Sequence, residues 1–167
     1  FADEAGAKAL SSPAASPQDL PFASSDGERR QITAMFCDLV GSTELSERLD
    51  GEDFRDLIAT YHETCSAAVK RFDGYVAQLL GDGVLAYFGF PRAHEDDAQR
   101  AIRAGLEIQS ALAAANSSRS GAALPQVFAR IGIHSGPVVV SRLGGDGRHE
   151  TLALGETVNV AARLQAI

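Results

Sequence analysis

The sequence has only two cysteines, Cys37 and Cys65, among its 167 residues. Their spacing matches no metal-binding motif and no disulfide framework, and both lie in apolar sequence patterns. We therefore expect two buried free thiols rather than a disulfide or a zinc site. Free thiols are typical of a reducing compartment, so the composition favours a cytoplasmic protein.

Excess positive charge and long apolar runs are also missing. The formal net charge is -7 and the isoelectric point is about 5.0, whereas nucleic acids and anionic membranes attract clustered Lys and Arg. No apolar run approaches the roughly 18 residues that a membrane-spanning helix needs, and no signal peptide is recognisable. We expect a soluble protein that binds neither nucleic acid nor a membrane. The first residue is Phe1 rather than Met, which suggests part of a longer protein.

Residues 1–28 are rich in Ala, Ser and Pro and have no sustained apolar period. Such a segment buries too little surface to offset the entropy cost of ordering, so it is predicted to be a flexible linker. The remaining residues, 29–167, contain enough apolar residues for one domain with a hydrophobic core.

The apolar periodicity predicts alternating strands and helices in this domain. A strand should end at Asp38, and a helical stripe interrupted near Gly51 should follow and stop at Gly74. The later expectations are a hairpin at 75–89, a helix at 94–118, two extended segments at 127–143 separated by Ser-Gly-Pro, a strand at 151–155 and a helix from 156. The β-α-β-β-α-β order predicts an α+β fold with a ferredoxin-like split βαβ core, in which helices cover one face of an antiparallel sheet.

Two acids stand at the ends of predicted strands. Asp38 precedes the turn Gly41-Ser42-Thr43, and Asp82 lies between two glycines at the hairpin tip. If the two strands are neighbours, both carboxylates lie at one edge and suit Mg²⁺ or Mn²⁺, and the turn offers backbone N–H groups to phosphate oxygens. Each acid alone also has an ordinary structural reading, as a helix N-cap or a turn residue.

A polar pair marks the last predicted helix. Asn159 and Arg163 are four residues apart and share a face, while Val160 and Leu164 lie on another face at core spacing. Taken alone, such a pair is most simply a solvated surface.

The four segments "FCDLVGST", "GDGVLAYFG", "RIGIHSGPVVV" and "GETVNVAARLQ" resemble, in order and separation, those of class III nucleotidyl cyclase catalytic domains. The resemblance covers about residues 30–167 and is closest to bacterial domains carried on large regulators that contain ATPase modules. It implies that residues 29–167 convert ATP to cyclic AMP and pyrophosphate, within a longer protein that carries fused regulatory domains.

The resemblance also assigns roles to residues. It implies that Asp38 and Asp82, with the backbone carbonyl of Leu39, bind two Mg²⁺ or Mn²⁺ ions. One ion would lower the pKa of the ribose 3′-hydroxyl and the other would bind the triphosphate. Asn159 would orient the ribose, and Arg163 would stabilise charge on the α-phosphoryl group. In this family the metal acids of one subunit face the Asn and Arg of the other, so a homodimer with shared active sites is expected.

The sequence departs from the family pattern at the base-reading positions. Where adenylate cyclases usually have Lys and Asp or Thr, this chain has Gln78 and Leu152, and guanylate cyclases use Glu and Cys. ATP is the expected substrate, with GTP as the open alternative. The later strands of the family, which hold a phosphate-binding Lys, are expected to be missing from this chain. A catalytically weak, nucleotide-binding regulatory domain is therefore the alternative function.

Overall fold

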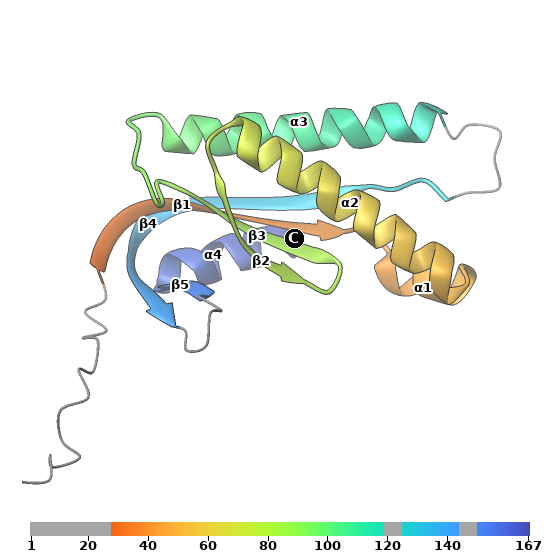
Figure 1. The fold of residues 1–167 in the computed structure, drawn as a ribbon, viewed down its shortest axis with the longest axis horizontal. Coiled ribbons are helices and arrows are strands. Elements are labelled where there is room, and N and C mark those ends of the chain that lie inside the picture. Colours follow the sequence, from red (N-terminus) through yellow and green to blue (C-terminus); the bar gives the residue numbers. More distant parts are fainter. Residues whose placement is uncertain (1–27, 119–124, 144–149) are drawn as a thin grey trace, which may run out of the picture.

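The computed structural model describes residues 28–118, 125–143 and 150–167, without the side chains of 141–143 and 150–152. All but the last residue of the predicted linker 1–28 lies outside the described residues, and the domain boundary stays a prediction. The elements, in chain order, are β1 (Glu28–Leu39), α1 (Ser42–Arg48), α2 (Gly51–Arg71), β2 (Tyr75–Leu80), β3 (Gly83–Phe88), α3 (Asp97–Ser118), β4 (Ala129–Leu143), β5 (Glu150–Leu154) and α4 (Glu156–Gln165) (Figure 1).

The five strands form one sheet in the order β2-β3-β1-β4-β5, and every neighbouring pair is antiparallel. The first four strands have the order of a split βαβ fold, which confirms the predicted α+β class. β1 lies at the centre, paired with β3 on one side and with β4 along its whole length on the other.

The side chains of β1 alternate between the two faces of the sheet, as a strand buried on both faces requires. Met35, Cys37 and Leu39 belong to one core cluster, whereas Ile32 and Ala34 belong to the other. By this alternation Asp38 lies on the same face as Ile32 and Ala34. That placement determines which helix the carboxylate meets.

Helices cover both faces of the sheet, so the prediction that they cover one face was wrong. α2 and α3 pack on one face, where their residues Tyr61, Cys65 and Ile108 are buried with those of β1, and α4 packs on the opposite face through Ala161 (Figure 1). Both cysteines are buried and free, as predicted. None of the helices in the described part of the chain is long and apolar enough to cross a membrane.

The predicted interruption near Gly51 is confirmed as the boundary between α1 and α2. The side chain of Asp50 accepts hydrogen bonds from the N–H groups of Glu52 (3.1 Å) and Asp53 (2.9 Å) and caps the start of α2. The predicted break at Ser-Gly-Pro was wrong, since β4 runs through it unbroken. Pro137 is tolerated there because β5 pairs with β4 only from Val139 onward, which leaves that edge of β4 without a strand neighbour at Pro137.

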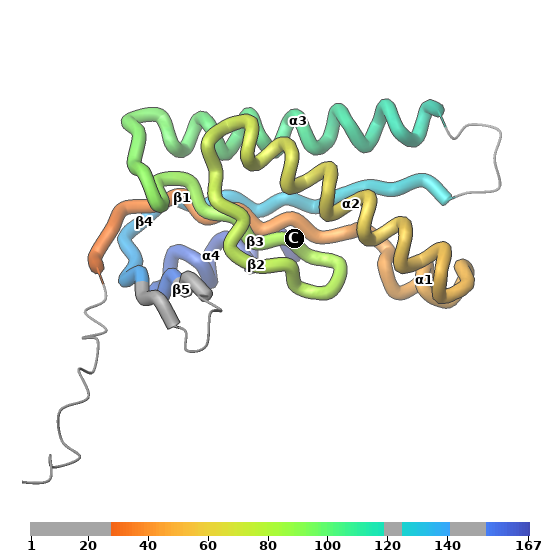
Figure 2. The backbone as a smooth tube through the Cα atoms, viewed as in Figure 1, coloured from red at the N-terminus to blue at the C-terminus, as the bar shows by residue number. Residues whose placement is uncertain are grey.

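The end of β1 and the turn of the β2–β3 hairpin lie at the same end of the sheet. Figure 2 shows the backbone passing from this end of β1 into α1, with the hairpin turn and the beginning of α2 nearby. This end of the sheet holds the candidate site.

Candidate active site

Strand register brings the two predicted metal acids together. Asp38 pairs with Gly83, so it lies beside the two-residue turn that contains Gly81 and Asp82. Gly81 adopts a positive φ of 61°, which is a left-handed conformation that favours glycine. Leu39 is the last residue of β1 and therefore lies at the same strand end.

The two carboxylates interact electrostatically. Burial raises the pKa of Asp38 above its usual value, and the neighbouring Asp82 raises it further, while the Arg130 guanidinium acts in the opposite direction. Two close carboxylates disfavour double ionisation unless a cation neutralises them. The environment of Asp38 therefore suits a bound cation.

The donor set fits a hard divalent ion. No cluster of three or more His, Cys, Asp or Glu suited to a metal occurs in the described ranges, so Asp38 and Asp82 form a set of two carboxylates. Mg²⁺ keeps several waters and is usually held by one or two carboxylates together with substrate phosphates. The residues present therefore fit Mg²⁺ or Mn²⁺ in a site that also takes a phosphorylated ligand.

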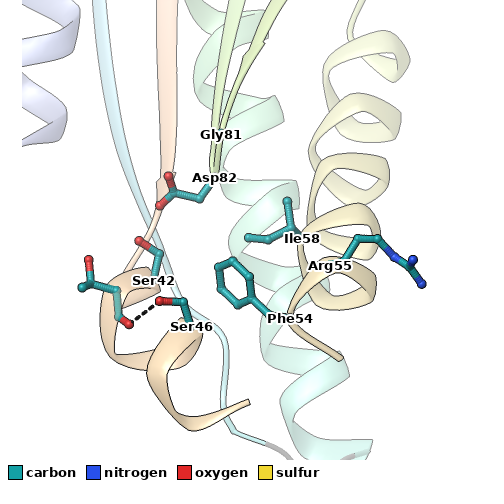
Figure 3. Close-up of a pocket in the computed structure, with 8 residues that line it drawn as sticks. Ser42, Ser46, Phe54, Arg55, Ile58, Gly81 and Asp82 are labelled. Atoms are coloured by element: carbon teal, nitrogen blue, oxygen red, sulfur yellow. Dashed lines mark hydrogen bonds between the residues drawn. The ribbon is translucent and has the colours of Figure 1, made fainter. Parts of the chain in front are cut away.

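A cavity of about 520 Å³ opens beside Asp82. Figure 3 shows Asp82 and Ser42 on one side of this cavity and Phe54 and Ile58 on another, with the Arg55 guanidinium pointing away. The cavity is lined by Ser42, Thr43, Ser46, Phe54, Arg55, Ile58, Gly81 and Asp82. Polar groups from α1 and the hairpin thus face an apolar side provided by α2.

The predicted phosphate-binding turn forms part of this cavity. Gly41 has φ 69° and accepts a hydrogen bond at its carbonyl from the N–H of Leu45 at 2.9 Å, which starts α1. Ser42 and Thr43 line the cavity, and the Ser46 hydroxyl donates to the Thr43 carbonyl at 2.7 Å. The structure therefore brings this turn and Asp82 to one cavity.

Sequence reasoning missed two partners of Asp38. Arg130 Nη2 donates to Asp38 Oδ2 at 3.2 Å, and Gln165 Nε2 donates to the same oxygen at 3.1 Å. Arg130 is directly opposite Asp38 in the β1–β4 register, and Gln165 ends α4. No local sequence signal identifies either residue, because each contact depends on long-range pairing.

Phe54 and Ile58 of α2 serve two purposes, because they pack against the core and also line the cavity.

Within one chain, the side chains of Asn159 and Arg163 point away from the sheet that carries Asp38. Both are exposed on α4, whereas Ala161 between them is completely buried against the sheet. Each is two residues from Ala161, or about 200° around the helix, so both point away from the sheet. Gln165 lies four residues beyond Ala161 and returns to the sheet side.

The base-reading positions lie on different strands. Gln78 is half-buried in β2 at a bulge, where it pairs with Leu85. Leu152 lies in β5, where its backbone pairs with Ser141; its side chain lies outside the described residues. The base-reading role of this pair stays a prediction.

Comparison with known proteins identifies the family. Residues 25–167 match the model of the adenylate and guanylate cyclase catalytic domain. A relative named Adenylate cyclase 1 from Rhizobium meliloti (strain 1021) is 36% identical over 139 residues, which cover 83% of this chain and 21% of the relative. The chain belongs to this cyclase family, and it spans about a fifth of that relative's length.

Solved structures agree with this assignment. The guanylyl cyclase Cya2 has a TM-score of 0.78 and 34% identity, with 84% of this chain and 72% of Cya2 covered. The adenylyl cyclase CyaB from P. aeruginosa has a TM-score of 0.78 and 29% identity, with coverage of 84% and 73%. The fold is thus shared with cyclases of both names, and the choice of base is a separate question.

Proposed function

We propose that this domain converts ATP to 3′,5′-cyclic AMP and pyrophosphate in a homodimer with two shared sites. The observation that carries the proposal is the proximity of Asp38, which pairs with Gly83, to Asp82 in the adjoining turn, beside the cavity that Ser42 and Thr43 line. Membership of the cyclase family and an adenylate cyclase relative support it.

In this proposal Asp38, Asp82 and the Leu39 carbonyl hold two Mg²⁺ or Mn²⁺ ions. When bound, the ions supply Lewis acidity toward phosphate oxygens and lower the pKa of the ribose 3′-hydroxyl. The 3′-oxygen forms a bond to the α-phosphorus as the bond to pyrophosphate breaks, and the hydroxyl proton leaves to solvent. The backbone N–H groups of the Gly41–Thr43 turn face the phosphates, and the apolar side of the cavity limits water.

Asn159 and Arg163 act on the site of the partner subunit. Their direction, away from the sheet and from Asp38 of their own chain, supports this arrangement. Asn159 orients the ribose, and Arg163 donates to the α-phosphoryl group as charge develops, an effect worth about 3 kcal/mol for one fixed donor. Two-fold symmetry then gives two equivalent sites.

Gln78 and Leu152 read the base in this proposal. A glutamine amide can both donate and accept, so it pairs with either purine, while leucine offers only apolar contact. We infer ATP as the preferred substrate with weak discrimination against GTP. We also place the domain in the cytoplasm as part of a longer protein with fused regulatory domains; its free, buried thiols suit that compartment.

The test is product identification. The protein is incubated with Mn²⁺ and either ATP or GTP, and the nucleotides are separated by chromatography, with Asp82→Ala as the matched control. We expect cyclic AMP from ATP in excess of cyclic GMP from GTP, and neither from the variant. Nucleotide binding without any cyclic product would favour the regulatory alternative instead.

A further inference from the structure

One oxygen of the Asp38 carboxylate accepts hydrogen bonds from a neighbouring strand and from a helix. Arg130 Nη2 (3.2 Å) and Gln165 Nε2 (3.1 Å) both donate to Oδ2. Neither donor contacts Oδ1, so these two bonds orient the carboxylate through Oδ2 and leave Oδ1 available to a cation shared with the neighbouring Asp82. Hydrogen bonds to a ligating carboxylate orient it, and their loss typically costs about 10–100-fold in metal affinity.

The two donors belong to different layers of the fold. Arg130 is the cross-strand neighbour of Asp38 within the sheet, and its side chain is 47% exposed. Gln165 belongs to α4, which is a separate layer. Of these two hydrogen bonds, the one from Gln165 connects the carboxylate to an element outside the sheet.

Backbone packing fixes α4 at this contact. Gly132 of β4 has no side chain, and a Cβ there would overlap the Ala161 carbonyl oxygen and the Gln165 backbone nitrogen, and would lie 2.8 Å from the Gln165 Cβ. The helix thus approaches the strand as closely as a glycine permits. The position of the Gln165 amide relative to Asp38 is consequently set by main-chain contact.

We propose that Gln165 is a positioning residue that orients Asp38 for the divalent cation and couples cation binding to the position of α4. This inference rests on the metal assignment of the proposed function. Because α4 carries Asn159 and Arg163 on its opposite side, cation binding in one subunit steadies the helix that serves the partner's site. Coupling of this kind is reciprocal, so the docked state of α4 strengthens cation binding by the same factor.

The alternative is that Gln165 only anchors the end of α4. The two roles differ in a measurable way, because an anchor changes stability without changing cation affinity. Gln165→Met keeps the length of the side chain and removes the amide, and Gln165→Ala removes both. Gln109→Met is the matched control, since Gln109 Nε2 on α3 donates to the Ala129 carbonyl at 2.8 Å on the other face of the sheet.

The experiment measures Mn²⁺ affinity of the whole chain by titration calorimetry, without nucleotide. We expect a Kd about 10-fold weaker in Gln165→Met, in line with the loss of an outer hydrogen bond. Gln109→Met should stay within about 2-fold of the parent, because its hydrogen bond does not involve the carboxylate. Gln165→Ala should show a similar Kd to Gln165→Met, which would exclude an effect of the methionine side chain itself.

Hydrogen exchange tests the coupling independently of activity. Mn²⁺ should slow exchange of the backbone amides of α4 in the parent and in Gln109→Met, and should have no such effect in Gln165→Met. An unchanged Kd in Gln165→Met, or α4 protection that persists in it, would overturn the inference while leaving the metal assignment intact. If the parent itself bound no Mn²⁺, both the inference and the metal assignment would fail.

Discussion

Gly132→Ala should separate α4 from the sheet. The added methyl group would overlap the Ala161 carbonyl oxygen and the Gln165 nitrogen, inside the 3.0 Å that real Cβ atoms essentially never breach. Because non-bonded heavy atoms rest about 3.5–4.0 Å apart, α4 must retreat by on the order of 1 Å. Main-chain atoms cannot rotate away as a flexible side chain can, so the whole helix must move.

Overpacking of this kind typically costs about 1–3 kcal/mol. For a domain of this size that corresponds to a fall in Tm of about 2–12 °C, since each kcal/mol shifts Tm by about 2–4 °C. The retreat also lengthens the contact between Gln165 and Asp38, so Mn²⁺ affinity should fall in parallel.

Gly105→Ala is the matched control, with the opposite expected sign. The atoms nearest to a Cβ at Gly105 would be methyl groups of Ile131 and Ile133 at 3.7 Å, which is ordinary contact, and alanine favours a helix over glycine by about 0.8–1.0 kcal/mol. Thermal melts followed by circular dichroism should therefore show a higher Tm for Gly105→Ala and a lower one for Gly132→Ala. A Gly132→Ala protein that melts at or above the parent temperature would refute the close packing of α4.

Two further predictions concern the site. Asp38→Asn should raise the Tm of the metal-free protein at pH 7, measured with a chelator present, because a raised folded-state pKa means that the ionised carboxylate disfavours folding. The gain in Tm should vanish as the pH falls below 3.8, where the side chain at position 38 is neutral in both proteins. An unchanged Tm at pH 7 would contradict the pKa argument. The double variant Gln78→Lys with Leu152→Asp should increase the ratio of kcat/KM for ATP to kcat/KM for GTP, because the new side chains supply hydrogen-bonding groups that the wrong base leaves unpaired. If the double variant is active and keeps the parent ratio, these two residues do not read the base.

The element types and the positions of the two acids follow from patterns that are local in sequence. Asp38 ends an apolar strand and Asp82 lies at a glycine-flanked turn. Their shared edge depends in addition on the pairing of β1 with β3, which local patterns do not specify and which the sequence supported only as a condition.

The remaining contacts of the site arise from long-range pairing. Arg130 and Gln165 meet Asp38 from 92 and 127 residues away in the chain, and no periodicity specifies strand register or helix docking at that range. The error at Pro137 has the same cause, because the local turn signal of Ser-Gly-Pro was overridden by continuous pairing of β4 with β1.

The central claim is that each active site combines the metal acids of one chain with Asn159 and Arg163 of another, and mixing two inactive variants tests it most directly. Asp38→Ala and Arg163→Ala are purified separately, assayed with ATP and Mn²⁺, then mixed, exchanged and assayed again. Each variant alone should be nearly inactive, and the mixture should regain cyclic AMP formation, because the heterodimer has one site with all its parts. If differently tagged subunits prove that heterodimers have formed and these heterodimers remain inactive, the result contradicts the account.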